Sequence, residues 1–167
     1  MTIRAKMNLT SSDGVAVDGQ VPSFQLGEEV EINGTVYKYF ISGAAIAQYS
    51  ACTVSNANVA VVGTTTTSGA KPTLFCIPQF AIAAANEYFW APIGPIAQYS
   101  YDGSTNFKVL AALDCATSVK LYTTATDGVV DDAATDLIAG LQLTETITTA
   151  RAATCIAQCR MVSNCQD

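Results

Sequence analysis

The chain has 167 residues, of which 50% are hydrophobic and only 13% are charged, and its net charge is −6. This length suits one domain or two small ones with a real hydrophobic core. The lysines and arginines are scattered along an acidic chain, so the basic surface of a nucleic-acid-binding protein is not expected. With so little charge, uncharged polar residues, alanine or other proteins must cover the surface.

The first residues, MTIRAKMNLTSSDG, lack the apolar centre of a secretory signal, and no segment approaches the ~20 apolar residues of a membrane-spanning helix. We therefore expect no membrane partner and synthesis in a cytoplasm. Residues 1–20 are polar and aperiodic, which predicts an extended N-terminal arm. A single β-rich domain should then occupy residues 21–167, with two β subdomains at about 21–78 and 79–167 as the alternative.

The strongest local prediction is a hairpin around Asn33-Gly34, because this dipeptide favours a type I′ turn. Pairing outward from the turn sets Glu29 opposite Lys38 and Val30 opposite Tyr37. Side chains alternate between the faces of a strand, so one face is mostly apolar and the other carries opposite charges across the pair. The first face contains Val30, Ile32, Thr35, Tyr37 and Tyr39.

Other segments extend the β pattern along the chain. Residues 107–113 and 118–124 flank a short loop and predict a second hairpin. Strand-like apolar or alternating segments occur at 73–77, 87–93, 140–148 and 154–162. Weak helical signals occur at 79–88 and 131–140. The predicted fold class is mainly β, an antiparallel β-sandwich or barrel-like domain with at most one or two short helices.

The pentapeptide IAQYS occurs at residues 46–50 and again at 96–100. An aromatic pair precedes each copy, Tyr39-Phe40 and then Phe89-Trp90, and a glycine-containing bend follows each pair. We interpret each unit as an aromatic strand, a bend, and a small-residue strand that ends in an exposed Gln-Tyr-Ser. The alternative is coincidence in an alanine-rich chain.

The six cysteines favour neither zinc nor an obvious disulfide framework. They are Cys52, Cys76, Cys115, Cys155, Cys159 and Cys165. An even number agrees with disulfides, but the expected cytoplasmic synthesis argues against them. The chain has no histidine and no CxxC spacing for zinc. We interpret the cysteines as small buried hydrophobic residues, with a disulfide as the alternative.

The sequence contains none of the residue patterns that are typical of enzyme active sites. Without histidine the chain has no Ser-His-Asp or Cys-His arrangement, and glycine-rich phosphate-binding motifs are missing as well. Four acidic residues lie close together, Asp127, Asp131, Asp132 and Asp136, but their spacing is not that of an EF-hand, and turn and cap roles explain them more simply. We predict no enzyme, no cofactor and no metal site.

The stretch Tyr88-Phe89-Trp90 has two interpretations. Aromatic residues are common in ligand platforms and at the centres of interfaces, and they also build core strands. We favour a core strand from which one of the three side chains reaches a partner.

Three patterns along the chain occur together. Residues 24–39 read FxLGxxVxxxGxxYxY, residues 88–90 read YxW before a bend at Gly94, and residues 138–145 read IxGLxLTE. Over roughly residues 20–162 the chain thereby resembles the head decoration, or cement, proteins of tailed bacteriophages. The residues that carry the resemblance are Phe24, Leu26, Gly27, Gly34, Tyr37, Tyr39, Tyr88, Trp90, Gly94, Ile138, Gly140, Leu141 and Leu143.

The resemblance implies a β-rich, non-enzymatic virion subunit on the outer surface of the capsid, assembled in the host cytoplasm. Its partners would be the major capsid protein and further copies of itself, commonly as a homotrimer, with no nucleic acid, membrane or cofactor. Candidate interface residues are Tyr49, Tyr99, Trp90, Arg4 and Lys6. The alternatives are a tail or fibre module, or a non-catalytic carbohydrate- or host-surface-binding β domain that would use Tyr88, Phe89 and Trp90.

Overall fold

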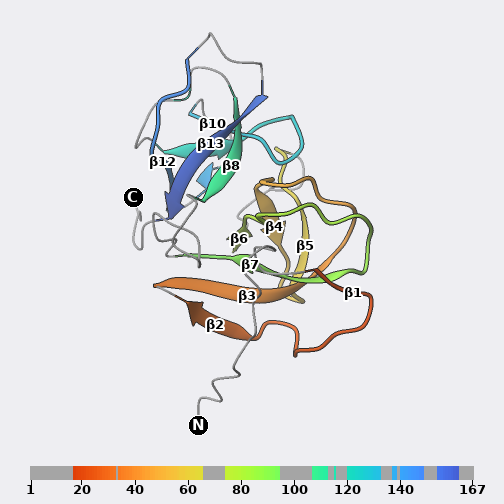
Figure 1. The fold of residues 1–167 in the computed structure, drawn as a ribbon. Helices are drawn as coiled ribbons and strands as arrows, with labels where there is room; N and C mark the ends of the chain where they lie inside the picture. The colour runs from red at the N-terminus through yellow and green to blue at the C-terminus, as the bar shows by residue number, and fades with distance from the viewer. Residues whose placement is uncertain are drawn as a thin grey trace.

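The computed structural model describes residues 17–32, 34–65, 74–94, 107–112, 115, 120–132, 137–138, 140–148 and 154–161. Within these ranges all regular structure is β, in thirteen strands and two mixed sheets, which confirms the predicted mainly-β fold class. The same ranges contain no helix that is long and apolar enough to cross a membrane. In Figure 1 the first sheet fills the lower part of the molecule and the second sheet lies above it.

The first sheet is built around one long strand, β3. Its members are β1 (Val17–Gly19), β2 (Glu29–Ile32), β3 (Thr35–Ser42), β4 (Cys52–Val54), β5 (Val59–Val62), β6 (Phe75–Cys76) and β7 (Tyr88–Pro92). The strand order is β1-β7-β3-β5-β4-β6, and β2 also pairs with β3. All pairs are antiparallel except β3 with β5. The sheet curves into a half-barrel.

The predicted hairpin is confirmed in its register. Glu29 pairs with Lys38 and Val30 with Tyr37, and the Lys38 Nζ lies 3.1 Å from the Glu29 Oε1. Tyr37 and Tyr39 are buried, as expected for the apolar face. Gly34 takes a φ of 80°, a conformation that glycine adopts without strain. Asn33 lies outside the described residues.

The second sheet is almost closed by the chain itself. Its strands are β8 (Lys108–Ala112), β9 (Leu121–Thr123), β10 (Val130–Asp131), β11 (Leu137–Ile138), β12 (Leu141–Leu143) and β13 (Thr154–Met161). They lie in the order β11-β9-β10-β8-β13-β12. Only positions 139 and 140 separate the two outermost strands, β11 and β12, in the sequence. The sheet therefore forms a nearly closed barrel.

The predicted hairpin between 107–113 and 118–124 is wrong. Strand β10 lies between β8 and β9, and Val130 pairs with Ala111 on one side and with Thr123 on the other. The first of these pairings is parallel and non-local, so the turn signals between β8 and β9 do not indicate it.

The two weak helix predictions are also wrong. In 79–88 the chain forms a bridge between Ile82 and Ile46 and then enters β7. In 131–140 the described residues belong to β10, β11 and a turn. Alanine is the best helix former, but helix propensity is small compared with tertiary packing, and burial of Ile82 and Ile46 in their bridge outweighs it here.

Strand β13 follows the predicted alternation. Ala157 and Cys159 are buried, whereas Thr154, Ile156 and Arg160 are exposed. This buried side faces the core, since Ala157 and Cys159 belong to the larger hydrophobic cluster.

The two sheets share their larger core. Tyr37, Tyr39 and Trp90 from the first sheet belong to one buried cluster with residues of the second sheet, among them Val109 and Leu121. A smaller cluster lies within the first sheet. It contains Phe40, Ile46, Cys52, Val54, Ala60, Cys76, Ile82, Phe89 and Ala91. The described parts of the two sheets are thus packed against each other through aromatic and aliphatic side chains.

The segment predicted as an N-terminal arm ends within the first sheet. Its last described residues form β1, which pairs with β7 through Val17 and Phe89. Residues 1–16 lie outside the described residues. Strand β7, which follows the alternative domain boundary at residues 78 and 79, pairs with β3 from the preceding segment.

Candidate functional site

The first IAQYS copy lies where the two sheets meet. The Tyr49 N–H donates to the Pro78 carbonyl at 2.9 Å, and the Tyr49 carbonyl accepts the N–H of Leu110 on β8 at 2.9 Å. Two residues on, the Ala51 N–H donates to the Gly128 carbonyl at 2.9 Å. The pentapeptide and the residue that follows it therefore connect the first sheet with two segments of the second.

The local structure of this copy differs from the prediction. After the bridge at Ile46 the chain turns instead of forming a strand, and Tyr49 has a φ of 67°. Gln48 is exposed as predicted, but Tyr49 is half-buried and Ser50 is 1% exposed. The predicted strand does not form, because the N–H and the carbonyl of Tyr49 form hydrogen bonds with Pro78 and Leu110 at the junction between the two sheets. The second copy, 96–100, lies outside the described residues.

The side-chain amide of Gln79 adds two hydrogen bonds at the junction between the two sheets. Gln79 Oε1 accepts the Lys108 N–H at 3.0 Å, and Gln79 Nε2 donates to the Lys108 carbonyl at 2.9 Å. The Lys108 ammonium lies 5.6 Å from the centre of the Tyr49 ring, within cation–π distance. No sequence pattern marked Gln79, because its role depends on the spatial proximity of β8.

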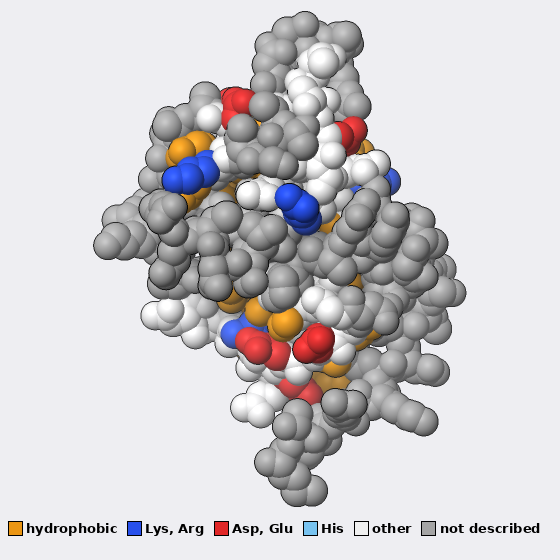
Figure 2. Space-filling model, turned by 90° about the vertical axis from the view of Figure 1, so that its left-hand side faces the viewer, with side chains coloured by type: hydrophobic (Ala, Val, Ile, Leu, Met, Phe, Trp, Pro, Cys, Tyr) orange, Lys and Arg blue, Asp and Glu red, His pale blue; other side chains and the backbone are white. Residues whose placement is uncertain are grey.

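The candidate interface residues are not gathered at one place by the described structure. Tyr49 is half-buried beneath Lys108, and Trp90 is 3% exposed. Tyr99, Arg4 and Lys6 lie outside the described residues. On the face drawn in Figure 2, acidic side chains of the described residues gather in the lower part beside a basic one, and the other charged side chains lie apart from one another.

Four of the aromatic residues that the sequence singled out, Phe24, Tyr39, Tyr88 and Trp90, form one cluster. The centre of the Tyr39 ring lies 5.5 Å from that of Phe24, 5.1 Å from that of Trp90 and 5.9 Å from that of Tyr88. Tyr39 and Trp90 are direct cross-strand partners, and so are Phe40 and Phe89. The two aromatic pairs that precede the IAQYS copies therefore face each other in the sheet, and Tyr88-Phe89-Trp90 is a core strand.

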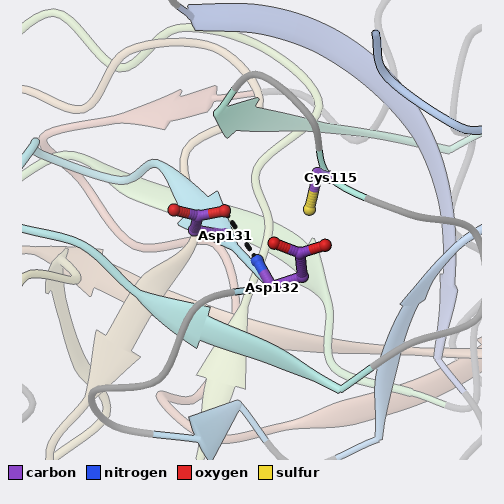
Figure 3. A group of neighbouring side chains, drawn as sticks. All are labelled: Cys115, Asp131 and Asp132. Carbon is purple, nitrogen blue, oxygen red and sulfur yellow. Dashed lines mark hydrogen bonds between the residues drawn. The ribbon is translucent and has the colours of Figure 1, made fainter.

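A cysteine and two carboxylates form the one potential metal-ligand group among the described residues (Figure 3). Ligand atoms of Cys115, Asp131 and Asp132 lie within 4.8 Å of one another. The Asp132 N–H donates to Asp131 Oδ1 at 2.7 Å (Figure 3). Of the four aspartates in the predicted turn, these two meet, Asp127 is exposed elsewhere, and Asp136 lies outside the described residues.

The protonation state of Cys115 decides what this group can bind. Thiolate and carboxylate are both zinc ligands, but the neutral thiol is not. Burial, followed by the negative charges of Asp132 and Asp131, raises the pKa of Cys115 from 9.0 to about 12. At neutral pH Cys115 is therefore a neutral thiol beside the two carboxylates, and a cation would have to displace the thiol proton.

We predict that Cys115 makes the folded state sensitive to alkali. The unfolded chain loses this thiol proton near pH 9 and the folded chain near 12, so the stability that depends on the proton is present below pH 9 and is lost as the pH rises. The free energy of unfolding of the Cys115→Ala variant should fall less steeply over this range than that of the wild type, in urea titrations at several pH values. Val130→Ala, a buried variant without a titrating group, should keep the wild-type slope, and equal slopes for Cys115→Ala and the wild type would contradict the prediction.

No protein-family model, curated protein or solved structure matches this chain.

Proposed function

We propose that the protein is a structural virion subunit that binds the outer surface of a phage capsid and stabilises it by bridging neighbouring major capsid proteins. The observation that carries the proposal is the position of the residues that resemble decoration proteins. Each of these residues is either a glycine with a positive φ or a side chain that packs in the core. The pattern therefore reflects what this fold requires at those positions.

The glycines of the pattern illustrate this agreement. Gly27, Gly34, Gly94 and Gly140 have φ values of 83°, 80°, 106° and 81°. Residues with a Cβ atom rarely adopt such values. Each glycine of the pattern thus marks a turn that other residues would strain.

The apolar residues of the pattern lie in the shared core. Phe24, Tyr39, Tyr88 and Trp90 form the aromatic cluster of the first sheet. Ile138, Leu141 and Leu143 are buried in the barrel and belong to the same hydrophobic cluster as Tyr39 and Trp90. The three short patterns are distant in the sequence and meet in one core, which supports their interpretation as a single signature.

The sheet edges supply a second argument for assembly. The first sheet ends at β1 and β6, and no described strand pairs with the outer edge of β2. Exposed strand edges are commonly covered by partner chains or by other copies of the same chain. A carbohydrate-binding role would need an exposed aromatic platform, whereas Phe89 and Trp90 are buried. We therefore retain capsid binding, with a homotrimer as the proposed oligomer.

The copy number of the protein in purified virions tests the proposal. A cement subunit should be present in a simple ratio to the major capsid protein, such as one to one or one to three, since icosahedral symmetry fixes the number of its sites. Quantitative mass spectrometry of purified particles measures this ratio. A handful of copies per particle would instead place the protein at a tail or a single vertex, and complete absence would refute a virion role.

A further inference from the structure

Two of the buried cysteines face each other across a strand pair. Cys52 on β4 and Cys76 on β6 are direct antiparallel partners, and both are 0% exposed. Side chains of directly opposed residues project from the same face of a sheet. In the same ladder the Val54 N–H donates to the Leu74 carbonyl at 3.0 Å. Since hydrogen-bonded and non-hydrogen-bonded pairs alternate, Cys52 and Cys76 form a hydrogen-bonded pair with an expected Cα–Cα distance of about 5.5 Å.

This geometry suits a covalent bond between the two sulfurs. Disulfides join cysteines whose Cα atoms are roughly 4.4–6.8 Å apart, and this pair lies within that range. Because the Cβ atoms of a hydrogen-bonded pair lie about 5.5 Å apart, against about 3.8 Å in a disulfide, formation of the bond draws the two strands slightly together. The Cys52 thiol donates to the Ser50 carbonyl oxygen at 3.5 Å, and its proximity is one of the causes that raise the pKa of Cys76. Cys155 and Cys159, by contrast, lie four positions apart on β13 and are too distant from each other to bond.

We propose that Cys52 and Cys76 are a cross-linking site at which a disulfide ties β4 to β6 within the first sheet. The oxidant is a low-molecular-weight disulfide of the glutathione type. One cysteine thiolate attacks it, forms a mixed disulfide and releases one small thiolate. The second cysteine thiolate then attacks the mixed disulfide and releases the other. The two cysteines lose two electrons, the oxidant is reduced to two thiols, and these thiols take up the two protons.

The location of the pair predicts when the reaction takes place. Burial and the neighbouring Cys52 raise the pKa of Cys76 well above its ordinary value, so little thiolate is present in the closed sheet. Strand β6 has only two residues and lies at the end of the strand order. Opening of this short strand, or oxidation before the sheet closes during folding, exposes both thiols to the oxidant.

Peptide mapping of the full-length chain tests the site. One sample is incubated folded with oxidised glutathione, and a second is refolded from urea in a mixture of oxidised and reduced glutathione. Remaining thiols are then alkylated, and the chain is digested without reductant. We expect a Cys52–Cys76 linked peptide that disappears on reduction, together with the loss of two alkylated thiols per chain. The link should form in the refolded sample at least, and faster there than in the folded one.

Two variants show whether the register selects the partner. Cys52→Ser should abolish the linked peptide and leave Cys76 fully alkylated. Cys159→Ser removes an equally buried thiol that has no cysteine opposite it among the paired residues of β12, Leu141 to Leu143, and should leave the Cys52–Cys76 yield unchanged. Full alkylation of Cys52 and Cys76 in both wild-type samples, or preferred pairing of either one with another cysteine, would overturn the proposal.

Discussion

Replacement of Phe89 by alanine is expected to destabilise the fold by about 3–5 kcal/mol, the range for deleting a buried aromatic side chain. Phe89 is 0% exposed, and its ring centre lies 5.9 Å from that of Phe40 and 6.3 Å from that of Phe80. It also pairs with Val17 of β1 through the backbone. The variant thus leaves a cavity between β7, β3 and the segment that carries Phe80. Because whole domains are stable by only roughly 5–15 kcal/mol, much of the fold's stability is at risk.

Urea unfolding followed by the fluorescence of Trp90 measures this loss, since Trp90 is the only tryptophan and lies beside Phe89 in β7. Val21→Ala is the control, because Val21 is 76% exposed and its truncation should change stability by less than about 0.5 kcal/mol. If the Phe89→Ala variant lost less than roughly 1 kcal/mol, the smaller core cluster would not be packed as described.

Substitution of Gly128 by alanine should cost roughly 2–5 kcal/mol, from two separate penalties. The φ of Gly128 is 67°, and a Cβ atom there would lie 2.5 Å from the Cβ and 2.7 Å from the Oγ of Ser50. The backbone has little room to shift, because the Gly128 N–H donates to Gly63 and its carbonyl accepts the N–H of Ala51. The new methyl group would push against the junction between the two sheets.

A second glycine separates the two penalties. Gly34 has a φ of 80°, but a Cβ atom there would meet nothing within 4 Å. Gly34→Ala should therefore cost only the backbone strain, about 1–2 kcal/mol. Adding Ser50→Gly to Gly128→Ala should recover part of the loss, because it removes the two closest atoms. Equal urea midpoints for Gly128→Ala and Gly34→Ala would show that the contact with Ser50 is not restrictive.

Local patterns in the sequence predicted local structure well. The hairpin register follows from a turn dipeptide and the alternation around it, and the exposed and buried sides of β13 follow from alternation alone. The aromatic strand β7 was also recognisable, although the choice between platform and core needed its partner Tyr39.

Non-local pairings are the part that the sequence did not predict. The insertion of β10 between β8 and β9 depends on a parallel pair between Val130 and Ala111, which leaves no turn signal. The contact of Cys115 with Asp131 and Asp132 and the opposition of Cys52 and Cys76 likewise depend on which strands become neighbours. The residue types indicated which chemistry was possible, but the order of the strands in the folded sheets determines which residues meet.

The link between β11 and β12 affects how the second sheet can come apart. In an open sheet, an outermost strand can fray while the rest stays paired, because it is held on one side only. Here the two outermost strands are joined through positions 139 and 140, so a displacement of β11 from β9 pulls on β12 and its pairing with β13. The barrel thus has no independent end at which unzipping starts, and its six strands are expected to exchange their amide hydrogens as one cooperative unit.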